Sequence, residues 1–117
     1  MIVQATEQEG YEKLSQELRR GVVILAALSQ LQTPQYGYSL IDRLAERGFS
    51  IDQGTLYPLL RRLESQGFLD SMWNVEGSRP RRYYVINDAG RTLLGQLSHD
   101  WQSLAEVMQR LLTNEGA

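Results

Sequence analysis

The spacing of hydrophobic residues predicts a long helix near the start of the chain. Residues 11–31 have a helical period, with Leu14 and Leu18 one turn apart and then the apolar run VVILAAL. A helix that is apolar on every side is buried, so we expect its second half to pack against the domain and a partner chain. Pro34 lies just beyond its end. Residues 1–10 lack a sustained period and are expected to form a flexible N-terminus.

Two shorter helices are predicted next, each followed by a glycine that can end a helix. The first covers residues 38–47 and the second covers residues 53–66. Two N-terminal caps are available to the second helix. Asp52 is a good cap residue, and Ser50 with Gln53 three positions later forms a rival capping box. The sequence leaves both open.

The pattern then changes to that of a β-hairpin. Residues 69–75 roughly alternate between apolar and polar side chains, and residues 81–86 (RRYYVI) are rich in aromatic and β-branched side chains. Between them, residues 76–80 (EGSRP) have the composition of a turn. Neighbouring side chains of a strand point to opposite faces. Of the two adjacent tyrosines, we expect Tyr84 to be the inner one.

A last helix is predicted over residues 88–113, capped by Asn87. Its apolar residues repeat at the spacing of a coiled-coil seam. They are Leu94, Leu97, Trp101, Leu104, Met108 and Leu111. A helix of about 26 residues is roughly 39 Å long, too long to be covered by so small a domain. We therefore expect this seam to pair with a second copy of the chain.

The order of helix, helix, helix, hairpin and long helix predicts a mainly α fold with a small β-hairpin (class α+β). This is a winged helix-turn-helix with a long C-terminal dimerisation helix. We divide the chain into a flexible N-terminus (residues 1–10), a winged helix-turn-helix DNA-binding domain (residues 11–86) and a dimerisation helix (residues 87–117).

The third predicted helix has the two faces that a recognition helix needs. Four leucines form one stripe: Leu56, Leu59, Leu60 and Leu63. The other face carries side chains that read base edges or bind phosphate, and a glycine that allows close approach to the groove. They are Gln53, Gly54, Thr55, Tyr57 and Arg61. Pro58 is an anomaly, because a proline inside a helix removes a backbone hydrogen bond.

Composition and charge limit the remaining functions. The 117 residues include no cysteine and one histidine, so we expect neither a metal site nor a cofactor. The longest apolar run has 7 residues, too few to span a bilayer. The first residues of the chain include glutamates where a signal peptide would have lysine or arginine. We therefore expect a cytoplasmic protein without a membrane partner. The net charge of −2 argues against nucleic acid, but five arginines lie between residues 61 and 82, among them Arg79 and Arg81 of the hairpin.

Catalysis is not expected. The chain has no G-x-S-x-G, H-E-x-x-H, P-loop or dinucleotide-binding motif. His99 lies between Ser98 and Asp100, but neighbours along a helix point to different faces, so the three cannot form a triad.

Four short motifs carry a resemblance to a known family. They are Tyr36-Gly37-Tyr38, Gly54-Thr55-Leu56-Tyr57-Pro58, the wing Arg79-Pro80-Arg81-Arg82-Tyr83-Tyr84, and Asp88-Ala89-Gly90. From about Leu18 to the end of the last helix, the chain resembles PadR-type transcriptional regulators. The resemblance implies a homodimer that represses transcription, with the recognition helix and wing on double-stranded operator DNA. It also makes Pro58 a family feature and adds Tyr36 to the residues expected at the DNA.

The single C-terminal helix resembles the compact branch of the family, which includes multidrug-sensing repressors. In those proteins a tryptophan of this helix stacks on flat aromatic compounds at the dimer interface, and Trp101 falls at the matching place. From the residues alone, Trp101 is either ordinary packing or such a platform. The chain departs from a polar-lined pore, because the first helix offers only apolar residues there: Val22, Val23, Ala26 and Ala27.

These observations predict a sequence-specific DNA-binding regulator, a homodimeric repressor released by a planar aromatic effector at Trp101. The expected DNA contacts are Tyr36, Gln53, Gly54, Thr55, Tyr57, Arg61, Arg79 and Arg81. The alternative is a winged-helix module that binds only protein, with its arginines on acidic partner surfaces.

Overall fold

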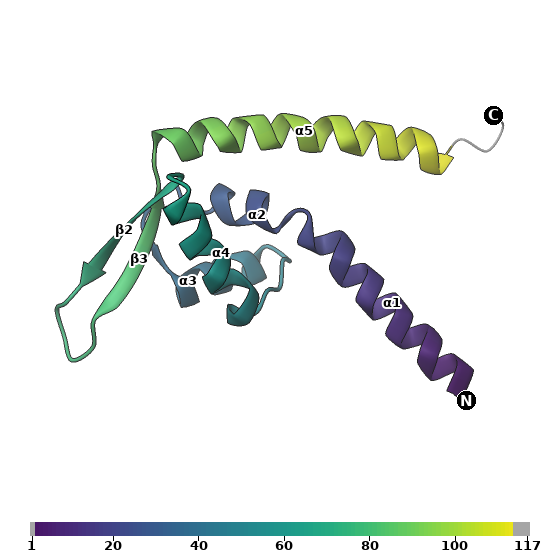
Figure 1. Cartoon of the computed structure of the whole chain (residues 1–117), viewed down its shortest axis with the longest axis horizontal. Coiled ribbons are helices and arrows are strands. Elements are labelled where there is room, and N and C mark those ends of the chain that lie inside the picture. Colours follow the sequence, from purple (N-terminus) through teal and green to yellow (C-terminus); the bar gives the residue numbers. More distant parts are fainter. Residues whose placement is uncertain (1, 114–117) are drawn as a thin grey trace.

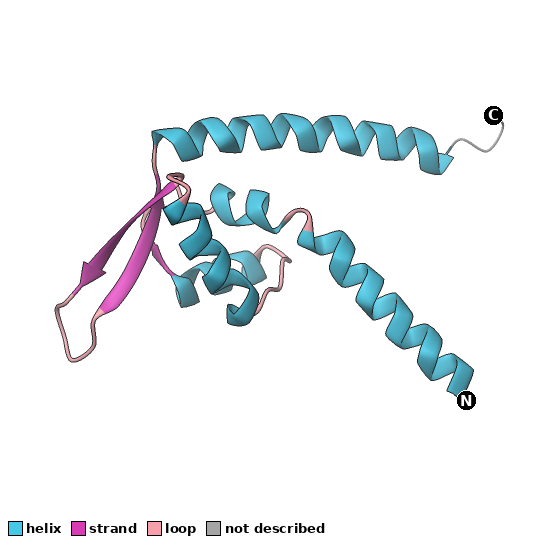
Figure 2. Ribbon diagram, viewed as in Figure 1, coloured by secondary structure: helices cyan, strands magenta, loops and turns pink. Residues whose placement is uncertain are grey.

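The computed structural model describes residues 2–113, which form five helices and three short strands (Figures 1 and 2). In chain order they are α1 (Ile2–Arg20), α2 (Val23–Ser29), β1 (Gln35–Tyr36), α3 (Gly37–Glu46), α4 (Gln53–Ser65), β2 (Leu69–Asn74), β3 (Arg81–Ile86) and α5 (Asp88–Thr113). The arrangement confirms the predicted fold class, a mainly helical winged helix-turn-helix with a long C-terminal helix. None of the helices described is long and apolar enough to cross a bilayer.

The start of the chain differs from the prediction. Residues 2–10, expected to be flexible, are helical and belong to α1. The helix predicted over residues 11–31 is instead two helices, broken at Gly21 and Val22. Glycine is a poor residue for a helix interior, and the chain changes there from largely exposed to largely buried. The break lets α2 enter the core while α1 points away from it (Figure 1).

The core lies between α2, α3, α4 and the sheet. The leucine stripe predicted on the third helix is confirmed, since Leu56, Leu59, Leu60 and Leu63 of α4 are all buried. They pack with Leu40 and Leu44 of α3, Ala27 and Leu28 of α2, Leu31, and the inner residues of the sheet. The exposed side of α4 therefore faces away from the domain.

The sheet has three antiparallel strands in the order β1-β3-β2. The hairpin prediction is confirmed, with pairing from Leu69 opposite Ile86 to Asn74 opposite Arg81. Strand β1 was not predicted, and it adds two residues to the free edge of β3. Tyr84 is the inner tyrosine, as expected, and burial raises the pKa of its hydroxyl above the ordinary value. The hydroxyl is therefore neutral at physiological pH.

Local caps fix the ends of the helices. Asp52 is the cap of α4, because its Oδ1 accepts the N–H of Thr55 at 2.8 Å, which decides between the two alternatives. Gly48 and Gly67 adopt φ of 91° and 89° just beyond α3 and α4, a region that favours glycine. Asn87 caps α5 as predicted, since its Oδ1 accepts the N–H of Gly90 at 2.9 Å.

Helix α5 is covered only at its N-terminal end. A Cβ on Gly90 would overlap the carbonyl of Phe68, so the first turn of α5 lies directly on the chain between α4 and β2. Leu94 and Leu97 pack against the core. Beyond Leu97 the helix runs on past the domain (Figure 1).

Candidate nucleic-acid interface

Helices α3 and α4 pack together as a helix-turn-helix, and the hairpin of β2 and β3 forms a wing beside α4. On α4, Gln53, Gly54 and Thr55 occupy the first turn and Arg61 lies two turns further, all exposed. Pro58 lies on the same exposed side. The residues predicted to face a groove are thus accessible from one side of the helix.

Tyr57 differs from the other predicted contacts on α4 because its ring is half-buried against the start of α3. A Cβ on Gly37 would overlap Cε1 of the Tyr57 ring. A larger residue at position 37 would therefore displace the Tyr57 ring from this place. Sequence reasoning noted Gly37 only as part of a motif, because the partner that needs it lies twenty positions along the chain.

A cluster of tyrosines holds Arg81, at the start of β3. The rings of Tyr36 and Tyr38 are parallel, with centroids 5.7 Å apart, and the Arg81 guanidinium carbon lies 5.6 and 5.7 Å from them. Arg81 Nη1 donates to the Tyr38 hydroxyl at 3.0 Å. Asn74 Nδ2 donates to the Tyr36 hydroxyl at 2.9 Å. These contacts orient Arg81 without neutralising its charge.

Arg82, unlike Arg81, has an acidic partner within the chain. Its Nη2 forms an ion pair with Glu64 Oε1 of α4, and its Nε donates to Ser71 Oγ of β2 at 3.1 Å. The Ser71 hydroxyl donates to the other oxygen of Glu64. The Arg82 and Glu64 side chains are only 33% and 26% exposed. This network, which we call the Arg82–Glu64–Ser71 cluster, joins α4 to both strands of the wing. The alternation of side chains along the strand predicts that Arg82 shares the inner face of β3 with Tyr84. No sequence pattern identifies Glu64 as the partner of Arg82.

The remaining arginines of the predicted surface form no ion pair within the described residues. The two ion pairs found within residues 2–113 are Arg82 with Glu64 and Arg91 with Asp88. Arg61, Arg79 and Arg81 belong to neither. Arg79 lies in the turn of the wing, where Gly77 adopts φ of 89°. It lines a cleft of about 410 Å³ with Arg81 and the acidic Glu76.

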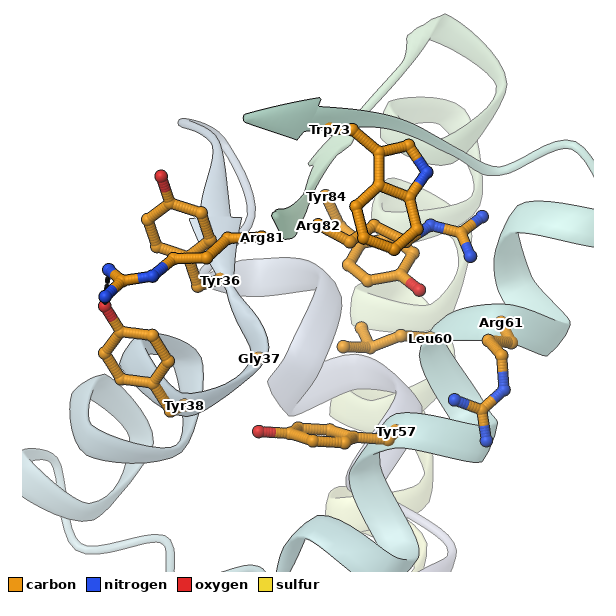
Figure 3. Close-up of a pocket in the computed structure, with 10 residues that line it drawn as sticks. All are labelled: Tyr36, Gly37, Tyr38, Tyr57, Leu60, Arg61, Trp73, Arg81, Arg82 and Tyr84. Carbon is orange, nitrogen blue, oxygen red and sulfur yellow. Dashed lines mark hydrogen bonds between the residues drawn. The ribbon is translucent and has the colours of Figure 1, made fainter. Parts of the chain in front are cut away.

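Four of the predicted residues surround one cavity of about 360 Å³ (Figure 3). They are Tyr36, Tyr57, Arg61 and Arg81. Gln53, Gly54 and Thr55 do not line this cavity. Tyr38, Trp73 and Arg82 do, although sequence reasoning did not include them among the site residues.

The predicted seam of α5 is half-buried at its N-terminal end and exposed over the rest of its length. Leu94 and Leu97 are half-buried, whereas Trp101, Leu104, Met108 and Leu111 are exposed. Trp101 lines a trough of about 380 Å³ between α2 and α5. The trough is lined by Val22, Leu25, Ala26, Ser29, Phe49, Leu94, Ser98 and Gln102 besides the tryptophan.

The fold and the exposed face of α4 define this chain as a winged helix-turn-helix protein. Its sequence matches the profile of the Transcriptional regulator PadR-like family over residues 24–96. The chain therefore belongs to the PadR-like family of transcriptional regulators, which are DNA-binding proteins and not enzymes.

Individual relatives agree with this assignment. The chain is 35% identical to the transcriptional regulator Rv3488 of Mycobacterium tuberculosis over 97 residues, 82% of this chain and 88% of that protein. A PadR family regulator from Eggerthella lenta is 42% identical with a TM-score of 0.87, covering 93% of this chain and 97% of its own. The X-ray structure of a PadR-like transcription factor from Bacteroides fragilis is 30% identical in sequence and has a TM-score of 0.70. The match covers 85% of this chain and 98% of that one.

The Arg82–Glu64–Ser71 cluster predicts a stability effect. Replacing Glu64 with glutamine removes the counter-charge of a guanidinium that is two-thirds covered. We expect the free energy of unfolding to fall by about 1–3 kcal/mol, the range for a lost charge-assisted hydrogen bond. Urea unfolding at one protein concentration measures it. Glu46→Gln at the exposed end of α3 is the matched control, and equal midpoints for the two variants would contradict the prediction.

Proposed function

We propose that this chain is a sequence-specific DNA-binding repressor that acts as a homodimer. In this proposal α4 enters the major groove, with Gln53, Gly54, Thr55 and Arg61 toward the bases. The wing lies over the neighbouring backbone. The observation that carries the proposal is a run of three guanidinium groups, those of Arg61, Arg81 and Arg79, that form no ion pair within the described residues. Arg61 and Arg81 line one cavity, and Arg81 and Arg79 line the adjoining cleft.

The tyrosines support the same surface. Tyr36 and Tyr57 have hydroxyls that can donate to phosphate, and each is held by a neighbour, Asn74 for Tyr36 and the start of α3 for Tyr57. A side chain that is already oriented loses less conformational entropy on binding. Phosphate contacts of this kind set the register of the protein on DNA, while α4 reads the sequence.

The double variant Arg79→Ala/Arg81→Ala is expected to weaken binding to every DNA sequence. Each arginine that neutralises a phosphate releases about 0.9 counterion, so the slope of log K against log salt should fall by about 2. Fluorescence anisotropy with a labelled promoter fragment at several salt concentrations measures it.

The control for this experiment is Arg110→Ala, which removes an exposed arginine from the last turn of α5. It should leave the slope unchanged. If the unaltered protein ignored DNA at low salt and instead co-purified with one protein partner, the alternative of a protein-binding module would replace this proposal.

The homodimer is proposed from the apolar surface that the single chain leaves uncovered. On α5 this surface includes Trp101, Leu104, Met108 and Leu111, and on α1 it includes Tyr11, Leu14 and Leu18 at helical spacing. Contiguous apolar surface of this kind is typical of an interface. A second copy would cover both stripes and hold two α4 helices about 34 Å apart, one turn of DNA.

The variant Leu104→Glu is expected to be monomeric at concentrations where the unaltered chain is a dimer, because a charge would be buried without a partner. Sedimentation velocity measures this. Gln109→Glu introduces the same charge beside the seam and should remain dimeric. If the unaltered chain were monomeric, or if the Leu104→Glu variant were still a dimer, dimerisation through the seam of α5 would be contradicted.

A second candidate function, release by an aromatic effector, is favoured by the trough at Trp101. Its lining has no charged side chain, and its size suits a flat, neutral or weakly polar compound. Phe49 lines this trough and also the neighbouring pocket beside Asp52 and Thr55. A ligand that displaced Phe49 would therefore disturb the segment that caps α4.

Acridone, a flat dye that is uncharged at neutral pH, is expected to quench tryptophan fluorescence by stacking on Trp101. Because Trp73 adds background, the titration is repeated with Trp101→Ala, in which the saturable component should disappear. A response of the same size in that variant would contradict an effector site in the trough.

A further inference from the structure

The C-terminal end of α1 lies beside the loop that joins α3 to α4 (Figure 1). Arg19, in the last turn of α1, donates from Nη2 to the carbonyl oxygen of Ser50 at 2.6 Å. Its guanidinium carbon also lies 4.7 Å from the centroid of the Phe49 ring, within the range of a cation–π contact. One side chain of α1 is therefore attached to two consecutive residues of the loop.

The loop leads directly into the first turn of α4. Asp52, two positions after Ser50, caps α4 by accepting the N–H of Thr55, which belongs to the turn proposed to face the bases. At the other end of the loop, the N–H of Phe49 donates to the carbonyl oxygen of Leu44 in α3 at 2.8 Å. Because this bond ties the start of the loop to α3, a shift of the Ser50 carbonyl is passed on toward the cap of α4.

The joint between α1 and α2 allows α1 to change its direction. The helix is interrupted at Gly21 and Val22, so α1 does not continue rigidly into the core. The exposed apolar stripe of α1, proposed to be covered by a second copy of the chain, consists of Tyr11, Leu14 and Leu18. The stripe ends one residue before Arg19. A partner chain that holds this stripe therefore also holds the arginine at the loop.

The surroundings of Arg19 favour a positioning role over a direct contact with DNA. Arg19 and Arg20 line a pocket of about 230 Å³, and two arginines in one pocket suggest a phosphate site. The carboxylate of Asp52 lines the same pocket, however, and would repel a phosphate there. The guanidinium of Arg19 is in addition already bound to the loop.

We propose that Arg19 is a positioning residue that couples the dimer interface to the recognition helix. When a partner chain holds α1, Arg19 holds the Ser50 carbonyl and the Phe49 ring, and the first turn of α4 keeps the geometry that reads DNA. When α1 is released, the loop loosens and the affinity for the operator falls. The effect on DNA rests on the proposed function, whereas the attachment of the loop to α1 does not.

Hydrogen exchange of the full chain without DNA tests the attachment. Arg19→Gln should speed exchange in the peptide covering residues 50–56 by roughly threefold to tenfold, because the loop opens more easily. Arg20→Gln is the matched control, since it removes the neighbouring arginine and neither contact to the loop. Both arginines are exposed, so thermal melting should show both variants folded. Equal exchange in the two variants, or an equal acceleration in α3 of Arg19→Gln, would overturn the proposal.

The link to the dimer is tested by a double-mutant cycle. Dissociating the dimer, by dilution or with Leu104→Glu, should speed exchange of residues 50–56 in the unaltered chain. It should add nothing in Arg19→Gln, where the link is already cut. Leu104 lies on α5 and does not line the pocket at Arg19. Additive effects, or a chain that is monomeric at every concentration, would overturn the coupling.

DNA binding separates positioning from a direct contact. Arg19→Gln should lower the ratio of the affinities for a promoter fragment and a random fragment by roughly threefold to tenfold. The slope of log K against log salt should stay unchanged. A phosphate contact would instead weaken both fragments equally and lower the slope by about 0.9, which would overturn the proposal. If the unaltered chain bound no DNA, the proposed function would fail together with the effect on DNA, while hydrogen exchange would still decide whether α1 holds the loop.

Discussion

The ion pair between Arg82 and Glu64 holds the wing against α4, and the surface outside the core depends on it. A two-stranded hairpin has little stability by itself and needs another element to pack against. Here the inner residues of the strands pack on α4 in the core. An electrostatic attachment is added to this, with Ser71 binding both partners so that each strand of the hairpin is tied to the helix. The cost of desolvating these charges is limited because both side chains keep about a third or a quarter of their surface exposed. The pair thereby sets the distance between α4 and the wing.

A second attachment fixes the other side of the wing. Strand β1 pairs with β3 and leads directly into α3, so the first residue of that helix is positioned by the sheet. The Tyr57 ring then lies against Gly37, where an added Cβ would displace it. Together with the Arg82–Glu64–Ser71 cluster, this makes α3, α4 and the wing a single unit. A DNA strand that moved one of them would therefore strain the others.

The sequence was sufficient wherever structure depends on near neighbours. The leucine stripe of α4, the glycines after α3 and α4, the cap at Asn87 and the bounds of α5 all follow from spacing and local chemistry. It was insufficient where a contact joins distant positions. The pairing of β1 with β3 spans about fifty residues, and Glu64 meets Arg82 across eighteen, so neither leaves a local pattern. The same limit applied at Gly21, where the change from exposed to buried surroundings determines that one apolar run becomes a separate helix.

The acidic net charge does not oppose DNA binding once the charges are placed in the structure. Helix α1 carries four glutamates, Glu7, Glu9, Glu12 and Glu17, and it leads away from the domain on the side remote from the wing (Figure 1). The chain is 59 Å in its longest dimension, many times the Debye length of about 8 Å at physiological salt. Glutamates at the far end of α1 therefore cannot screen Arg79 or Arg81. What remains near the wing is a short-range positive surface, which attracts an anion only on close approach. Such a surface favours a ligand that also fits its shape, as a DNA groove against α4 would.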